Sequence, residues 1–170
     1  TVHCTVTRQQ VRRDGYLEEF LGYWQQNPHT RLIWMSLYTP QIGELSMERH
    51  SQADRVRVVA DLRRLRQKYS KLQLPEGLLD VYAEPPDSPE NCIFAQTTDC
   101  FSSDLERRVM PCQLGGNPDC SNCGCMASAG LEAIGRHRYK GWIPVGRIFY
   151  ASLKVGKTIG RLRGAAVQGT

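Results

Sequence analysis

The chain has 170 residues, of which 41% are hydrophobic and 23% are charged, and its formal net charge is +5. This composition is close to that of an average globular protein and is sufficient for a full hydrophobic core. No apolar run approaches the ~18 residues that a membrane-spanning helix requires, and the first residues lack the basic start and apolar stretch of a secretory signal. We therefore expect a cytoplasmic protein without membrane partners.

The first part of the chain alternates strand and helix patterns. Positions 2–7 alternate with a period of two and are rich in β-branched residues, which predicts a buried strand. Because the chain starts inside this strand, we expect it to be a fragment of a longer protein. Apolar residues at helical spacing predict a helix over 13–26, which Asn27-Pro28 ends, and the almost continuously apolar segment 31–38 predicts a second strand.

A second long helix follows. Ser51 and Asp54 have the spacing of a capping box, with Asp in place of the usual Glu. The helix has arginines on its polar face and an apolar stripe formed by Val58, Leu62, Leu65 and Tyr69. A third strand is expected in either 72–75 or 78–82, and the pattern alone does not decide between them. The order strand–helix–strand–helix–strand predicts parallel, right-handed βαβ units.

Three prolines within 84–89 mark a boundary, so we divide the chain into domains 1–84 and 85–170. Beyond the boundary we expect a short helix over 127–137 and a late strand over 145–150. The last segment is basic and has no acid after Glu132. We interpret it as a solvated tail and do not expect a nucleic-acid partner, because charge runs usually face solvent.

Cysteines dominate the second domain. Six of the seven lie between positions 92 and 125, and the last four follow the spacing Cys-x7-Cys-x2-Cys-x-Cys. Such spacing gathers thiolates around one point, as a metal ion or an iron–sulfur cluster requires. The odd total and the lack of a signal peptide disfavour disulfides. The predicted ligands are Cys112, Cys120, Cys123 and Cys125, followed by Cys100 and then Cys92, whereas Cys4 is expected to be a buried apolar side chain.

Zinc and iron–sulfur clusters both need about four thiolates. A structural zinc site usually has two Cys-x2-Cys knuckles, and this chain has only the one at 120–123. The irregular spacing therefore favours a cluster held by loops. A zinc-stabilised binding module, with a structural thiolate site and a basic tail for an anionic partner, remains the alternative.

A second candidate site lies where the predicted strands end, because parallel sheets bind ligands at their carboxyl edge. Hydroxyl side chains occur there at Thr5, Thr7 and Ser36, with Gln41 and Glu44 just beyond. For any one of these residues, a hydrogen-bonded interior hydroxyl is the simpler interpretation.

Three stretches carry a resemblance to a known family: His3-Cys-Thr-Val-Thr-Arg8, Ile33-Trp-Met-Ser-Leu-Tyr-Thr-Pro40, and the block from Cys92 to Ala129 that includes Pro111-Cys-Gln-Leu-Gly-Gly116. Over most of positions 1–156 the chain resembles the C-terminal half of a radical S-adenosylmethionine (SAM) enzyme with an auxiliary cysteine-rich segment. The resemblance implies an α/β fold, namely the C-terminal part of a partial (β/α) TIM-like barrel followed by a cysteine-rich lobe.

The resemblance also implies cofactors and partners. The cysteines would hold an auxiliary [4Fe-4S] cluster, and Thr5, Thr7 and Ser36 would contact SAM in the full-length protein. The family's Cys-x3-Cys-x2-Cys loop, whose cluster cleaves SAM to a 5′-deoxyadenosyl radical, has no counterpart in this sequence. We expect it in an N-terminal half of the same enzyme. A small-molecule or peptide substrate and an electron donor such as ferredoxin or flavodoxin are further implied partners. The family's usual auxiliary run is Cys-x2-Cys-x5-Cys, from which the run here departs.

Overall fold

The computed structural model describes residues 1–167, and side-chain exposure up to residue 163. Its first part is built on two parallel strands, β1 (Val2–Val6) and β2 (Ile33–Leu37), which pair in register from Val2 opposite Ile33 to Val6 opposite Leu37. Leu72 adds a single parallel bridge to Ile33. The main-chain N–H and C=O of Ile33 both bond to the 71–73 segment, so β2 lies between β1 and this bridge. The two predicted strands are confirmed, and the third is reduced to one bridge.

The helix predicted over 13–26 corresponds to α2 (Tyr16–Gln26), and the short helix α1 (Arg8–Arg12) before it was not predicted. Helix α2 begins after its N-cap Gly15, whose positive φ of 74° is a left-handed conformation that glycine adopts readily. Further along, α3 (Gln52–Lys68) and α4 (Glu76–Ala83) follow β2. The segment 78–82, considered as a strand, therefore belongs to α4. Buried side chains of the strands and of α1–α4 form one hydrophobic core.

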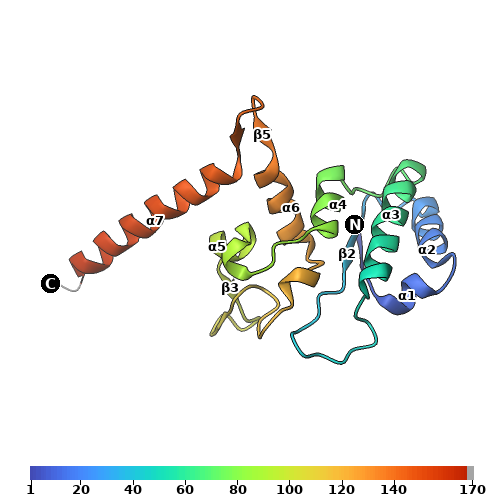
Figure 1. Ribbon diagram of the computed structural model, residues 1–170, viewed down its shortest axis with the longest axis horizontal. Coiled ribbons are helices and arrows are strands. Elements are labelled where there is room, and N and C mark those ends of the chain that lie inside the picture. The colour runs from blue at the N-terminus through green and yellow to red at the C-terminus, as the bar shows by residue number, and fades with distance from the viewer. Residues whose placement is uncertain (168–170) are drawn as a thin grey trace.

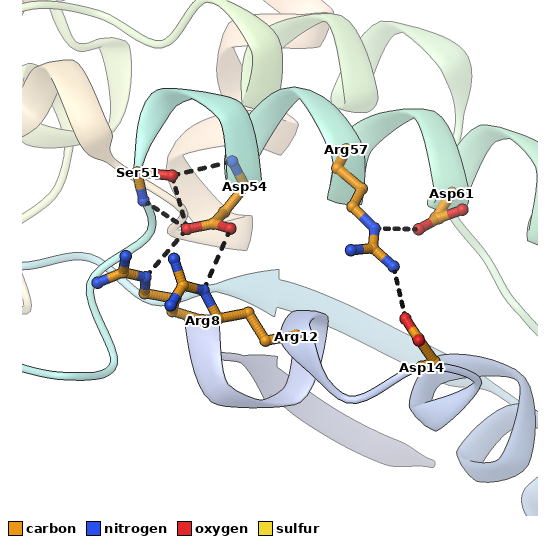
Figure 2. Close-up of polar contacts among 7 residues, drawn as sticks. All are labelled: Arg8, Arg12, Asp14, Ser51, Asp54, Arg57 and Asp61. Carbon is orange, nitrogen blue, oxygen red and sulfur yellow. Dashed lines mark hydrogen bonds and ion pairs between the residues drawn. The ribbon is translucent and has the colours of Figure 1, made fainter.

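The start of α3 is fixed by the predicted capping box (Figure 2). Ser51 Oγ accepts a hydrogen bond from the Asp54 main-chain N–H at 3.1 Å, and the Asp54 carboxylate accepts one from the Ser51 N–H at 3.0 Å. The same carboxylate pairs with Arg8 at 3.1 Å and Arg12 at 3.7 Å. These contacts tie α1 to the beginning of α3. The hydrogen bond from the Ser51 side chain is the largest cause that lowers the pKa of Asp54.

The second part of the chain has short elements joined by long loops. They are η1 (Pro89–Asn91), α5 (Ile93–Thr97), β3 (Cys100–Phe101), β4 (Arg108–Val109), η2 (Cys120–Asn122), α6 (Met126–Arg136), β5 (Arg138–Tyr139), β6 (Ile143–Pro144) and α7 (Gly146–Val167). Helix α6 agrees with the helix predicted over 127–137 and packs beside α4 (Figure 1). Among the described residues, no helix is long and apolar enough to cross a membrane.

The late strand predicted over 145–150 is wrong, because these residues form the last position before α7 and its first turns. Their β-branched and aromatic side chains favour a strand by propensity, but strand propensity depends on an available neighbour. The β5–β6 hairpin ends just before this segment, and the start of α7 packs instead against α5 and α6. The described residues thus form a mixed α/β fold with small two-stranded sheets.

Candidate metal centre

Five thiols line one small cavity in the second part of the chain. They belong to Cys92, Cys112, Cys120, Cys123 and Cys125, and all seven cysteines of the chain are free thiols. The cavity measures about 20 Å³, room for roughly one water molecule. The other lining residues are mainly apolar: Pro86, Pro89, Phe94, Ala95, Leu114, Pro118 and Ser128.

The four ligands ranked first from the sequence all line the cavity, whereas Cys100 does not line it but lies near enough to Cys112 to contribute to the raised pKa of that thiol. Cys100 lies on β3, outside the residues that line the cavity, whereas Cys92, ranked behind it from the sequence, lines the cavity and is buried. Cys92 Sγ lies 3.1 Å from Ser128 Oγ, which places the start of α5 against α6. Cys4, as predicted, is buried in the core of the first part.

Four of the five thiols occupy the ends of helices. Cys92 is the N-cap of α5, and Cys120 and Cys123 lie at the beginning and the C-cap of η2. Cys125 is the N-cap of α6, where its sulfur accepts a hydrogen bond from the Ser128 N–H at 3.5 Å. Helix ends leave main-chain groups without intrahelical partners, so they are suitable places for polar ligands.

The loop that carries three of these thiols docks on the carboxyl end of β2. The Leu37 N–H donates to the Gly124 carbonyl at 3.0 Å, and the Gly124 N–H donates to Thr39 Oγ1 at 2.8 Å. A β-carbon at position 124 would lie 2.2 Å from the Leu37 carbonyl oxygen, closer than non-bonded atoms can approach. Glycine is therefore required between Cys123 and Cys125.

A second contact joins the loop after β2 to the segment before Cys120. Gln41 Oε1 accepts a hydrogen bond from the Asn117 N–H at 2.6 Å, and the Asp119 N–H donates to the Pro40 carbonyl at 2.8 Å. Arg49 pairs with the Asp119 carboxylate at 2.8 Å. Gln41, placed near the sheet edge by the sequence, thus serves to hold the cysteine loop.

Arg55 in α3 fixes the same loop from the other side. Its side chain is almost completely buried, with 2% exposed, and its Nε donates to the Tyr82 carbonyl at 2.7 Å. Nη1 donates to the Asn122 carbonyl at 3.0 Å, and Nη2 donates to the Cys123 carbonyl. The prediction that the arginines of this helix lie opposite its apolar stripe is wrong for Arg55. The available signal was its position three residues before Val58, on the buried face.

The protonation of the thiols follows from their burial. The pKa of Cys120 and of Cys123 is raised to about 11; burial is the largest cause, and neighbouring thiols contribute to the rise. Both groups are therefore protonated at neutral pH in the metal-free chain. Two donors face the sulfurs: Gln113 Nε2 lies 2.9 Å from Cys125 Sγ, and Thr39 Oγ1 lies 4.0 Å from Cys123 Sγ.

The metal-binding atoms that face the cavity are the cysteine sulfurs, and the other lining residues are mainly apolar, which suits a soft metal ion or an iron–sulfur cluster. Within residues 1–167, no three histidine, cysteine, aspartate or glutamate side chains are placed so that they could hold a metal ion as they stand. The cavity has room for roughly one water molecule, so the segments that carry the thiols would have to move apart to admit a cluster while the sulfurs still face it.

The second candidate site is brought together in part. Thr5 and Ser36 are opposite each other in the β1–β2 register, and their hydroxyl oxygens lie 3.0 Å apart. His3 Nε2 also lies 3.0 Å from Ser36 Oγ, a partner that the sequence did not reveal. Thr7 has a different role, since its N–H donates to Gln10 Oε1 at 2.8 Å at the start of α1.

Comparisons with protein-family models, curated proteins and solved structures give no match for this chain.

Proposed function

We propose that this chain is the C-terminal portion of a radical SAM enzyme and that its cavity thiols hold an auxiliary [4Fe-4S] cluster. The observation that carries the proposal is the convergence of five thiols, from Cys92, from Cys112 and from the 120–125 loop, on one cavity. An iron–sulfur cluster needs about four thiolates, and clusters are commonly held by closely spaced cysteines in loops.

The position of the cavity supports the same function. The cysteine loop is bonded to the carboxyl end of β2, which is the edge where parallel sheets bind their ligands. Within the described residues β1 pairs only with β2, so its outer edge can accept further parallel strands of a partial barrel. Those strands would come from the N-terminal half of the enzyme, and Thr5 and Ser36 would then line the SAM site.

The residues of this chain have distinct tasks in such a site. A bound auxiliary cluster would supply either a ligand for the substrate or a path for electrons. The mostly apolar lining leaves few polar groups beside the thiols, and Gln113, Ser128 and Thr39 donate hydrogen bonds toward sulfur, contacts of the kind that tune cluster potentials. The substrate would be a small molecule or a peptide, with ferredoxin or flavodoxin as electron donor in a reducing cytoplasm.

Anaerobic reconstitution of the full chain with ferric iron, a thiol reductant and sulfide tests this proposal. We expect a brown chromophore with about four iron and four sulfide per chain, confirmed by Mössbauer spectroscopy. The chain alone should not cleave SAM. A colourless protein that binds one zinc per chain and no sulfide would contradict the proposal and favour the structural zinc site.

Cysteine variants identify the ligands. Replacing Cys120 and Cys123 by alanine together should abolish the chromophore, and Cys92→Ala should reduce it because this thiol lines the cavity. Two matched controls are Cys4→Ala, in the core of the first part, and Cys100→Ala, outside the cavity lining. Both controls should retain the iron content of the unmodified chain.

A further inference from the structure

Helix α7 lies mostly outside the body of the protein. It has 22 residues, a length of about 33 Å, and begins against α5 and α6 before extending away from the other elements (Figure 1). Phe149 and Leu153 line a groove shared with α5. The side of the helix that meets the body is therefore defined by these two residues.

Another side of α7 carries exposed apolar residues. Ile148, Val155, Ile159 and Leu162 are 57%, 59%, 45% and 67% exposed. At 3.6 residues per turn they fall within about 60° of one another, on a different face from Phe149 and Leu153. We call these four residues the apolar stripe. A continuous exposed stripe of this kind marks an interaction surface, unlike single exposed apolar residues.

All charged residues of α7 are basic, and neutral residues lie next to the apolar stripe. Arg163 lies about 40° beyond one edge of the stripe, and Arg147, Lys154 and Arg161 lie about 60–100° beyond the other edge. There is no acidic residue in α7 or anywhere after Glu132. This charge pattern fits an anionic surface. It disfavours a second copy of the same helix, because two copies would bring like charges together.

The hairpin before α7 adds interfacial residues. Trp142 is 83% exposed and Tyr139 is 57% exposed, and the Lys140 ammonium lies 5.6 Å from the centre of the Tyr139 ring. The Val145 N–H donates to the His137 carbonyl at 2.9 Å and closes the hairpin at the first turn of α7. Tryptophan, tyrosine and lysine are the side chains that favour the water–lipid boundary.

We propose that α7 and the β5–β6 hairpin bind the surface of an anionic phospholipid membrane. The helix would lie in the plane of the interface, with the apolar stripe toward the acyl chains and the arginines and lysines at the headgroups. Our expectation of no membrane partner rested on the lack of a spanning run. A helix that lies in the surface needs no such run. The inference is independent of the metal centre.

Vesicle flotation of the full chain tests the inference. We expect binding to phosphatidylcholine vesicles that contain roughly one-third phosphatidylglycerol, little binding to pure phosphatidylcholine, and weaker binding at high salt. Lys154→Glu with Arg161→Glu should weaken binding at least about 25-fold, since each cation near an anionic surface contributes about fivefold. Val155→Ser with Ile159→Ser should weaken it about tenfold at unchanged charge.

The charge-matched control is Arg31→Glu with Lys68→Glu, which makes the same change at exposed positions in the first part of the chain. It should bind within about threefold of the unmodified chain if α7 is the contact. Circular dichroism verifies that each variant is folded. Absence of binding to the anionic vesicles, or full binding by the Val155→Ser, Ile159→Ser variant, would overturn the inference. The inference would also be overturned if the chain formed dimers through α7 in the absence of vesicles, or if it bound a random RNA duplex and did not bind vesicles.

Discussion

Arg55 is the residue through which the first part of the chain should control the cysteine loop, and Arg55→Met tests this directly. The guanidinium donates to three main-chain carbonyls, those of Tyr82, Asn122 and Cys123. Methionine keeps most of the apolar stem and removes all three donors. Two of the carbonyls that lose a donor belong to the loop that holds the thiols.

The expected magnitude follows from these contacts. A hydrogen bond from a charged group contributes about 1.5–3 kcal/mol, so three contribute about 5–9 kcal/mol before the cost of burying the charge is subtracted. Burial is also the largest cause that lowers the pKa of Arg55. Removing the buried charge recovers part of that cost, and we expect a net loss of about 3–5 kcal/mol in the free energy of unfolding.

Urea unfolding of the metal-free chain measures the stability, and iron content after reconstitution measures the site. The matched control is Arg57→Met on the same helix, where the exposed arginine pairs with Asp14 and Asp61 at the surface (Figure 2). Such surface pairs contribute about 0–1 kcal/mol. The reasoning is refuted if Arg55→Met and Arg57→Met lose equal stability and both retain full iron content.

Three further predictions concern the scaffold. Gly124→Ala should lower the free energy of unfolding by more than about 2 kcal/mol and remove most of the bound iron, because the added β-carbon would clash with main-chain atoms of Leu37. The control Gly130→Ala, with open space at its β-carbon, should be neutral or stabilising. Equal stabilities of the two variants would contradict this prediction. Ser51→Ala removes the N-cap side chain of α3 and should lower the melting temperature by about 2–4 °C in a calorimetric scan. An unchanged melting temperature would show that the cap does not contribute to stability. Burial lowers the pKa of His50 below 6.5, so the unfolded chain binds a proton at this side chain before the folded chain does, and the free energy of unfolding falls as pH drops through about 6.5. His50→Gln should therefore reduce the pH dependence of the unfolding free energy measured between about pH 7 and pH 5. An unchanged pH dependence would refute this.

The elements that the sequence predicted well are those whose local pattern agrees with their packing. The two strands combine β-branched or apolar runs with burial, and α3 combines a capping box with an apolar stripe. The start of α2 at Tyr16 depends on the left-handed backbone of Gly15, which a helical apolar pattern does not reveal. The first turns of α7 depend on packing against α5 and α6, and this packing cannot be inferred from the amino-acid pattern of the segment itself.

For the candidate site, cysteine spacing was sufficient to predict a thiol cluster but not its membership. Cys100 is nearer to the other cysteines in sequence than Cys92 is, yet the packing of α5 on Ser128 of α6 brings Cys92 into the cavity lining. Arg55 could have been found, because an arginine within an apolar stripe is costly unless it is fully hydrogen-bonded. The contacts of Gln41 could not have been predicted from the sequence, because they join segments far apart in the chain.

The bond between Gly124 and Thr39 joins positions 85 residues apart, and the bond between Arg55 and Cys123 joins positions 68 residues apart. During synthesis the ribosome thus completes the receiving surface on β2 and α3 well before the sulfur-bearing loop emerges. Assembly of any inorganic centre at this place is consequently a late event, and a carrier that delivers iron and sulfide would meet a chain whose first part has already folded.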